Sequence, residues 1–116
     1  MSEESIVNDY QHFFIIRDTS PVTNLHSLVI PKRHIVSYFE CNKDEYEEIP
    51  VVLHTQKTEL KLTDDSITGF NIGMNIGEDS GQTVFHFHIH IIPRRKGDID
   101  NPRGGIRGVI PGKQKF

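Results

Sequence analysis

Residues 84–92 read Val-Phe-His-Phe-His-Ile-His-Ile-Ile, and the prediction of the fold starts from this stretch. Histidines and apolar residues alternate in it, as His86, His88 and His90 against Phe85, Phe87, Ile89 and Ile91. Strict alternation predicts a β-strand, because successive side chains of a strand point to opposite faces of its sheet. The apolar face can then pack on a core. The three imidazoles line up on the other face, each about 6.6 Å from the next, which is twice the rise of about 3.3 Å per residue.

The length and composition of the chain predict one globular domain over residues 1–116. A chain of 116 residues can bury a modest core, and its 35% hydrophobic and 25% charged residues fit a folded protein rather than a disordered one. Residues 97–116 are rich in glycine and proline, so they are expected to form an extended basic tail. The single cysteine, Cys41, excludes an internal disulfide and favours a reducing, intracellular setting.

The N-terminal residues predict a cytoplasmic protein. The first residues, MSEESIVNDY, are acidic and lack the basic start and apolar run of a secretory signal peptide. No apolar stretch of the sequence approaches the ~18 residues that a membrane span needs, so no membrane partner is expected.

Charge is distributed unevenly along the chain. Residues 1–92 carry 6 basic and 14 acidic side chains, whereas residues 93–116 carry 7 basic and 2 acidic ones. The basic residues of this end are Arg94, Arg95, Lys96, Arg103, Arg107, Lys113 and Lys115. A basic end beside a row of histidines favours an anionic ligand, so a local phosphate contact ranks first and a merely solubilising surface second. A nucleic-acid arm ranks last, because this end has one aromatic residue, Phe116, and no helical period.

The rest of the sequence predicts four further strands and a helix. The strands are expected at residues 6–7, 12–17, 26–30 and 70–75, the first two as a hairpin turned around Asn8-Asp9. Asn42 and Glu45 have the spacing of a capping box, which predicts the start of a helix. Pro50 lies inside that helix and removes one of its hydrogen bonds at a cost of about 3 kcal/mol, so a kink or break is expected near Ile49.

The histidine row allows three chemical interpretations. Two neighbouring imidazoles could share a metal ion, although the outer pair is about 13 Å apart along the backbone and cannot easily converge with the middle one at bonds of about 2.0–2.1 Å. A neutral imidazole could instead attack phosphorus and form a covalent intermediate, since an unperturbed histidine has a pKa of about 6.5. The histidines could also merely decorate the wet face of a sheet. Phosphoryl chemistry ranks first, metal binding second and decoration last.

The loop before the histidines suits a phosphate group. Residues 77–83 include Gly77 and Gly81, which let the main chain approach an anion closely. Main-chain N–H groups, the Gln82 amide and the Thr83 hydroxyl can donate to phosphate oxygens. A loop of this composition could also be an ordinary connection between strands.

The run His86-Phe87-His88-Ile89-His90-Ile91-Ile92 resembles the signature of the histidine triad (HIT) family, in which three histidines are separated by apolar residues. DTSPVTNLHSLVIPKRH, residues 18–34, and MNIGEDSGQTV, residues 74–84, resemble two further blocks of that family. The PRRKGD continuation and the basic tail resemble its bacterial members. The resemblance covers roughly residues 6–97.

This resemblance implies an α+β, HIT-like fold with about five antiparallel strands, one long helix and one short helix. It also implies a homodimer whose sheet is continuous across the subunits. The implied ligand is a purine nucleotide, with its α-phosphate at the three histidines.

The resemblance further implies a role for each matching residue. His88 would be the nucleophile, His86 would orient it through its main chain, His90 would hold a phosphate oxygen and assist the leaving group, and His26 would act as a relay. The nucleotide would be bound by Asp18 at the ribose hydroxyls, by Asn75, Gly81, Gln82 and Thr83 around the phosphate and leaving group, and by Ile16 and Phe14 as candidates for an apolar wall against the base.

Two departures from wider relatives refine the expected activity. Some family members bind zinc through an N-terminal CxxC pair that this sequence lacks, so no metal and no cofactor are expected, and His34 is expected to be structural. Nucleotidyl transferases of the superfamily have glutamine where this chain has His90, which favours hydrolysis. The expected function is a hydrolase of nucleoside phosphoramidates or dinucleoside polyphosphates that forms a nucleotidyl-histidine intermediate. A nucleotide-binding regulatory module with little turnover is the alternative, and a metal-dependent protein comes third.

Overall fold

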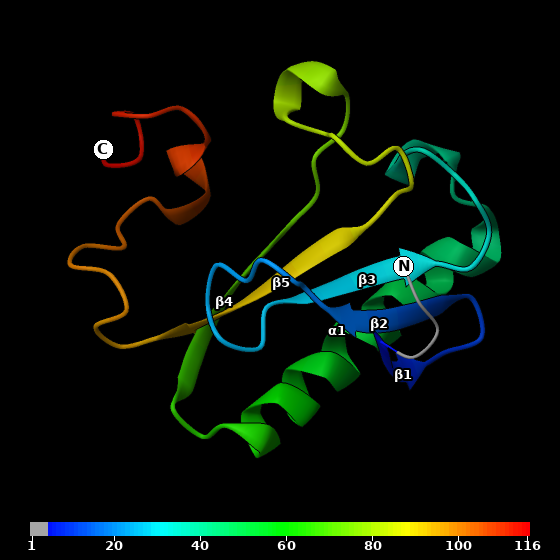
Figure 1. Cartoon of the computed structure of the whole chain (residues 1–116), viewed down its shortest axis with the longest axis horizontal. Coiled ribbons are helices and arrows are strands. Elements are labelled where there is room, and N and C mark those ends of the chain that lie inside the picture. Colours follow the sequence, from blue (N-terminus) through cyan, green and yellow to red (C-terminus); the bar gives the residue numbers. More distant parts are fainter. Residues whose placement is uncertain (1–4) are drawn as a thin grey trace.

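Five antiparallel strands and one α-helix form the regular core of the computed structural model, which describes residues 5–116 (Figure 1). The strands are β1 (Ile6–Asp9), β2 (Phe13–Arg17), β3 (Ser27–Pro31), β4 (Ile67–Gly73) and β5 (Ile89–Arg95), and they lie in the order β1-β2-β3-β5-β4. The helix α1 spans Lys43–Thr63, and the short 3-10 helices are η2 (Tyr38–Glu40), η3 (Glu78–Ser80) and η4 (Gly105–Val109). The predicted α+β fold with a five-stranded antiparallel sheet and one long helix is confirmed.

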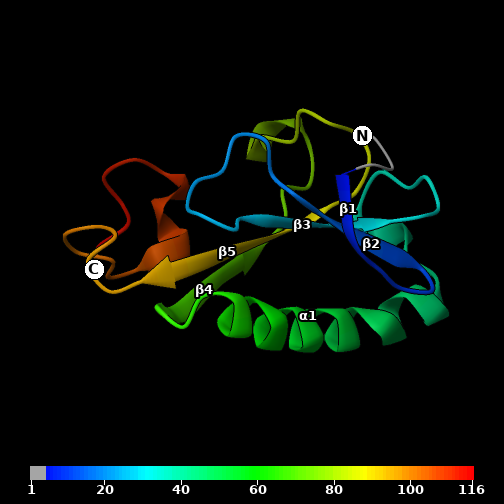
Figure 2. The same ribbon diagram turned by 60° about the horizontal axis from the view of Figure 1, so that its bottom comes forward.

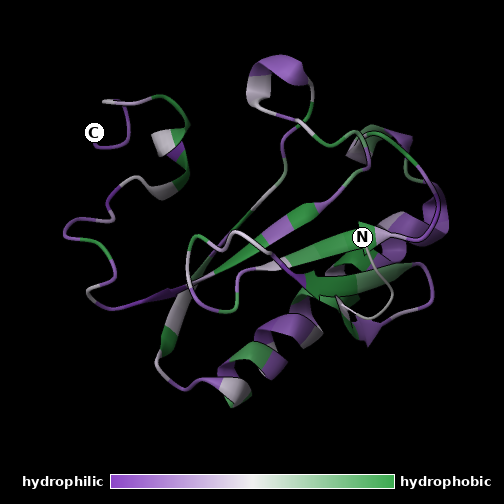
Figure 3. Cartoon of the chain, in the orientation of Figure 1, coloured by the Kyte–Doolittle hydropathy of each residue, from purple (hydrophilic) through white to green (hydrophobic). Residues whose placement is uncertain are grey.

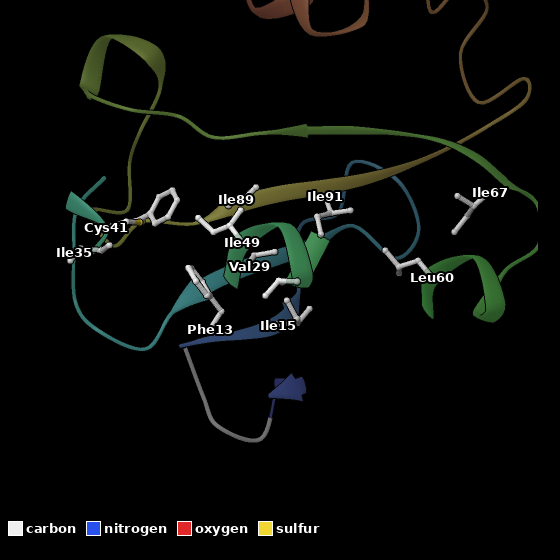
Figure 4. Packing of buried hydrophobic residues seen from close by; sticks show 12 residues of the cluster. Phe13, Ile15, Val29, Ile35, Cys41, Ile49, Leu60, Ile67, Ile89 and Ile91 are labelled. Atoms are coloured by element: carbon white, nitrogen blue, oxygen red, sulfur yellow. The ribbon is translucent and has the colours of Figure 1, made fainter. Parts of the chain in front are cut away.

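The helix and the loops occupy opposite sides of the sheet. In Figure 2, α1 packs along one face, while the loops that follow β2 and β4 lie on the other side. Strands β2 and β3 are largely hydrophobic, whereas α1 carries many hydrophilic side chains (Figure 3). Buried apolar residues fill the space between helix and sheet (Figure 4), among them Phe13, Ile15, Val29, Ile49, Val52, Leu60, Ile67, Phe87, Ile89 and Ile91. One face of the sheet is therefore committed to the core, and the other is left for a site.

The strand predicted over residues 84–92 is shorter than expected at its N-terminal end. Its ladder begins at Ile89, and Phe87 instead donates its main-chain N–H to the oxygen of Ile35 at 2.7 Å. Continuing the register with β3 would place Phe87 opposite Pro31, which has no N–H to donate. Phe85, predicted to face the core, is 49% exposed, so that expectation is wrong. The alternation itself is confirmed from Phe87 onward.

Helix α1 begins as the sequence predicts but is not interrupted. The main-chain N–H of Glu45 donates to Asn42 Oδ1 at 2.9 Å, and that of Asn42 donates to Glu45 Oε1 at 2.8 Å, which confirms the capping box. The helix continues through Pro50, so the predicted break near Ile49 is wrong. Because Pro50 is exposed, the carbonyl group that loses its partner can bind water, while burial of the opposite side holds the helix on the sheet.

Two strand boundaries also differ from the prediction. Asn8 and Asp9 lie within β1, and residues 10–12 make the connection to β2. Strand β4 covers Ile67–Gly73 rather than residues 70–75. No helix in the described part of the chain is long and apolar enough to cross a membrane.

The buried carboxylate of Glu45 generates a prediction about stability. Its side chain is 2% exposed and accepts from Arg33 Nη2 at 2.8 Å and Arg33 Nε at 3.2 Å, besides capping α1. We expect Glu45→Ala to lower the free energy of unfolding by about 1–3 kcal/mol in urea denaturation, because the Asn42 N–H loses its acceptor. Glu47→Ala, which removes an exposed pair with Lys43, is the control and should cost less than about 0.5 kcal/mol. Equal losses in the two variants would contradict this account.

Candidate active site

The candidate active site lies on the face of the sheet that α1 leaves free. A pocket of about 510 Å³ opens there between the end of β2, the start of β5 and the loop after β4. Its lining consists of Ile16, Asp18, Thr19, Ser20, Leu28, Asn75, Gly81, Gln82, Thr83, Val84, His88 and His90. The structure thus brings together eight of the eleven predicted site residues, and the other three, His26, His86 and Phe14, lie outside this lining.

Main-chain oxygens determine which nitrogens of His86 and His88 carry a proton. His86 Nε2 donates to the oxygen of Pro31 at 2.9 Å, and His88 Nδ1 donates to the oxygen of His86 at 2.9 Å. A carbonyl oxygen can only accept, so each of these ring nitrogens bears the hydrogen. A neutral imidazole has one such hydrogen, so Nε2 of His88 keeps its lone pair. Because His88 lines the pocket, this lone pair can serve as a nucleophile there.

His26 and His90 form a second hydrogen-bonded chain. The main-chain N–H of Val22 donates to His26 Nδ1 at 3.0 Å, so the proton of a neutral His26 is on Nε2. His26 Nε2 lies 2.9 Å from His90 Nδ1 and donates to it. His90 therefore carries its own proton on Nε2. The site consequently contains a ring with a free lone pair at His88 beside a ring with an N–H donor at His90.

Burial keeps this histidine pair neutral. His26 is 2% exposed, and its burial lowers its pKa, with the Asp18 carboxylate opposing that effect. Burial also lowers the pKa of His90, and the neighbouring His88 and His26 lower it further. Both rings are therefore uncharged near neutral pH, as the hydrogen-bond directions require.

A strained residue sets the position of His26. Leu25 has φ of 72°, in the left-handed region that a branched side chain rarely adopts. Its oxygen accepts from Ser27 Oγ at 2.7 Å, and Arg17 Nη1 donates to the same hydroxyl at 2.9 Å. These contacts fix the turn that delivers His26 to the start of β3. A positive φ at leucine has no sequence signal, so this support could not be predicted.

Asp18 has one oxygen engaged and one available. Oδ1 accepts from the main-chain N–H of Ser20 at 2.8 Å, and Oδ2 lies 3.6 Å from His26 Nε2. The distance of 3.6 Å is long for a hydrogen bond, and His26 donates to His90 instead. Oδ2 can therefore accept hydrogen bonds from hydroxyl groups of a ligand.

The glycine-rich loop is held together by Gln82. Gln82 is buried, and its Oε1 accepts from the main-chain N–H of Gly77 at 2.9 Å. Its Nε2 donates to the oxygens of Val36 at 2.9 Å and Val84 at 3.3 Å. Both amide hydrogens are thus taken, so the Gln82 side chain shapes the loop and has no free donor for a phosphate. Gly81 adopts φ of 94°, which only glycine takes readily, and the exposed Thr83 keeps its hydroxyl open to the pocket.

The apolar wall of the pocket comes from paired positions on two strands. Ile16 of β2 lies opposite Leu28 of β3, and both line the pocket, whereas Phe14 does not. Leu28 was not predicted from the sequence, and neither were the main-chain partners of the histidines at Val22 and Pro31. Leu28 could have been predicted, because it lies two residues after His26 in the same predicted strand and so shares its face. The main-chain partners could not, because nearly every residue has a main-chain N–H and oxygen.

Three residues of the site could in principle bind a metal ion. Asp18, His26 and His90 each offer a ligand atom within 4.8 Å of the others. The two histidine nitrogens are only 2.9 Å apart, whereas tetrahedral zinc with bonds of about 2.0–2.1 Å would hold them about 3.3 Å apart. This spacing fits a hydrogen bond better than two zinc bonds. The absence of a metal stays a prediction, as does a structural role for His34, whose ring lies 4.9 Å from that of His86.

Two arginines of the basic end pair with acidic groups of the protein itself. Arg94 donates to both oxygens of Asp98 at 2.8 Å, and this pairing holds the pKa of Asp98 well below its usual range. Arg95 Nη2 donates to Asp64 at 3.0 Å. Arg94 thereby links β5 to Asp98, and Arg95 links β5 to the C-terminal end of α1.

The chain is similar to known proteins over most of its length. The model of the HIT domain family matches residues 1–97. The chain is 38% identical to Protein hit from Bacillus subtilis over 97 residues, which are 79% of this chain and 63% of that protein. It is 38% identical over 89 residues to an adenylylsulfatase from Arabidopsis thaliana, 72% of this chain and 42% of that protein. The chain spans about three fifths of the first curated relatives, with coverages of 62%, 60% and 63% of their lengths.

Solved structures share the fold. A HIT family protein from Bacillus anthracis superposes with a TM-score of 0.74 at 39% identity, over 80% of this chain and 65% of that one. A hypothetical histidine triad nucleotide-binding protein from Sulfolobus tokodaii superposes with a TM-score of 0.72 at 36% identity, over 81% of this chain and 62% of that one. A diadenosine triphosphate hydrolase from Plasmodium falciparum superposes with a TM-score of 0.79 at 24% identity, over 87% of this chain and 68% of that one. At this identity, the similarity shows the fold alone.

The hydrogen-bond directions predict the tautomers of three histidines. Long-range proton–nitrogen correlation spectra near neutral pH should show His88 protonated at Nδ1 and His86 and His90 protonated at Nε2. The exposed His54 of α1 is the internal reference for a ring in solvent. A His88 ring protonated at Nε2 would contradict the account, because its lone pair would then not be available in the pocket.

The lowered pKa values predict how stability depends on pH. The unfolded chain binds protons at histidine below about pH 6.5, whereas folded His26 and His90 resist protonation. Their contribution to stability is therefore complete above about pH 6.5 and is lost as the pH falls from there toward their folded pKa values. Urea denaturation should show this loss of stability at low pH. The loss should be smaller in His26→Asn, because asparagine cannot be protonated. An equal loss in this variant would overturn the assignment.

Proposed function

The chain belongs to the histidine triad (HIT) family, and from that premise we propose that it is a nucleotide-binding hydrolase acting at an α-phosphate. The observation that carries the proposal is the hydrogen bond from His88 Nδ1 to the oxygen of His86, which leaves Nε2 of His88 free in the pocket. His88 is the nucleophile and takes the nucleotidyl group. Candidate substrates are purine nucleoside phosphoramidates and dinucleoside polyphosphates.

In the first step, Nε2 of His88 attacks the α-phosphorus. A bond forms between phosphorus and this nitrogen, and the bond from phosphorus to the leaving atom breaks with its electron pair going to that atom. The bound phosphate anion raises the pKa of the neighbouring His26–His90 pair, so the pair takes up one proton from solvent as the substrate binds. His90 Nε2 passes that proton to the leaving atom, and the pair becomes neutral again.

In the second step, water attacks the same phosphorus. His90 accepts a proton of the water, and the bond from phosphorus to His88 breaks with its electron pair returning to Nε2. The proton on the His26–His90 pair returns to solvent as the product leaves, which restores the neutral pair. The products are the nucleoside monophosphate and the protonated leaving group. The carbonyl oxygen of His86 accepts the Nδ1 hydrogen of His88 throughout, which favours the positive charge on that ring in the intermediate.

The nucleotide is recognised by groups around this centre. Oδ2 of Asp18 accepts hydrogen bonds from the ribose hydroxyls, since Oδ1 is held by Ser20. Ile16 and Leu28 form the apolar wall for the base. Thr83 donates to a phosphate oxygen, while Gln82 and Gly81 shape the loop, the Gly81 N–H being taken by the oxygen of Glu78.

The named relatives support a hydrolase of this class. The relative from Arabidopsis thaliana is an adenylylsulfatase, and the structure from Sulfolobus tokodaii is described as nucleotide-binding. A homodimer is proposed as the assembly. It is supported by the position of β4 at the edge of the sheet, where a second copy could extend the ladder through main-chain hydrogen bonds.

The role of His88 predicts a separation of binding from turnover. We expect His88→Ala to lower kcat/KM for an adenosine phosphoramidate by at least about 10³-fold, because the nucleophile is lost. Calorimetry should find nucleoside monophosphate binding within about threefold of wild type, since the recognition groups remain. His54→Ala, on the far side of the sheet, is the control and should leave both quantities unchanged.

Two outcomes would overturn the proposal. Hydrolysis at the wild-type rate by His88→Ala would exclude His88 as the nucleophile. Tight binding without turnover of either substrate class by the wild-type protein would favour a regulatory module that only binds nucleotides.

A further inference from the structure

A second, larger pocket adjoins the first one at His90. It has a volume of about 690 Å³ and lies between β4, β5 and the residues that follow β5. The two linings share only Asn75 and His90. The apolar side chains of the second pocket are Val22, Ile72, Met74, Ile92, Ile99, Ile106 and Val109. His90, with its Nε2 proton, thus stands at the junction between the pocket of Asp18 and His88 and a second, predominantly apolar pocket.

The outer wall of this pocket is a specifically folded part of the chain. Residues 102–116, here called the C-terminal wall, include η4 and close on themselves where Gln114 Nε2 donates to the oxygen of Arg103 at 3.3 Å. Gly104 has φ of 87°, and a Cβ there would lie 1.7 Å from the oxygen of Gln114, so only glycine fits. Ile106 packs toward β4, since a Cβ added at Gly73 of that strand would lie 3.5 Å from Ile106 Cδ1. The wall thus has a specific internal fold, and Ile106 is its contact with β4.

The second pocket offers no compensation for a strongly charged group. Arg94 is the one lysine or arginine in its described lining, and both its Nε and its Nη2 donate to Asp98 while Nη1 donates to Asn71 at 2.7 Å. Its charge is already balanced. Arg103 and Arg107 flank the ring of Phe116 at 5.0 and 5.1 Å and are not part of the lining. A polyphosphate in this pocket would be desolvated without a free cation.

The order of groups along the substrate follows from the position of His90. The nucleoside and its phosphate occupy the pocket of Asp18 and His88, and the leaving atom must meet the proton on His90 Nε2. Whatever is attached to that atom then extends into the second pocket. We propose, building on the proposed hydrolase function, that the second pocket binds an uncharged apolar leaving group, so the substrates are nucleoside phosphoramidates of apolar amines rather than dinucleoside polyphosphates.

The proposal is tested with adenosine phosphoramidates of unbranched alkylamines from ethyl to octyl. The basicity of these amines hardly changes along the series, so differences in rate report on binding of the alkyl chain. The expected result for the full chain is a rise in kcat/KM of about two- to fourfold per methylene group until the pocket is filled. The value of kcat/KM for the octyl compound should also exceed that for a diadenosine polyphosphate.

The chain offers a matched pair of variants for this test. Ile106 and Ile110 are 63% and 59% exposed and belong to the same segment, but only Ile106 lines the pocket. Ile106→Ser should lower the ratio of octyl to ethyl kcat/KM by about three- to tenfold. Ile110→Ser should leave the ratio unchanged. Ile106→Phe, which fills the pocket, should also lower the ratio, and it does so without introducing a polar group.

The outcomes separate this proposal from the proposed function. If no phosphoramidate is hydrolysed, the hydrolase function itself is wrong for this class of substrate. Three results would show that only the apolar leaving-group pocket is wrong, provided that the ethyl compound is hydrolysed. In these, kcat/KM does not rise with the length of the alkyl chain, the octyl-to-ethyl ratio is equal in both serine variants, or kcat/KM for the octyl compound is below that for the diadenosine polyphosphate. Loss of a dimer in Ile106→Ser during sedimentation, with the ratio unchanged, would identify this face as an interface between copies instead.

Discussion

The hydrogen bond from His88 Nδ1 to the main-chain oxygen of His86 is the interaction on which the proposed chemistry depends. It decides which nitrogen of His88 has a lone pair, and it is made by residues 86–88, which lie outside the ladder of β5. Two anchors hold them there. His86 donates to Pro31, and Phe87 donates to Ile35 while its ring is buried in the core. Burial of Phe87 thus helps to fix the tautomer of His88, which lines the pocket.

The second constraint is the contrast between the two pockets that meet at His90. One combines an apolar wall with Asp18, His88 and the glycine-rich loop, and the other is lined mainly by isoleucine, valine and methionine side chains. The neutral His26–His90 pair stands between them. Burial opposes its charge in the free protein, and in the proposed mechanism the arrival of an anionic phosphate favours its protonation. The proton is thereby available when a leaving group is present to receive it.

The sequence was sufficient for features that depend on local residue order. The alternation around His88 predicted which side chains share a face, and the capping box of Asn42 and Glu45 predicted where α1 begins. Features that depend on distant partners were not predictable. The strand begins late because Pro31 lies opposite Phe87, and the helix passes Pro50 because its other side is buried against the sheet. The assignment of Gln82 to phosphate binding likewise overlooked main-chain oxygens that only the folded loop brings within reach.

The central claim is that the reaction passes through a covalent bond to a histidine, and the stereochemical course at phosphorus tests it most directly. Each in-line displacement at phosphorus inverts its configuration, so two successive displacements restore it. Hydrolysis of a phosphoramidate made chiral at phosphorus by sulfur and oxygen isotopes should therefore proceed with net retention. Net inversion would mean that water displaces the leaving group in one step, and it would contradict the role of His88 as the nucleophile.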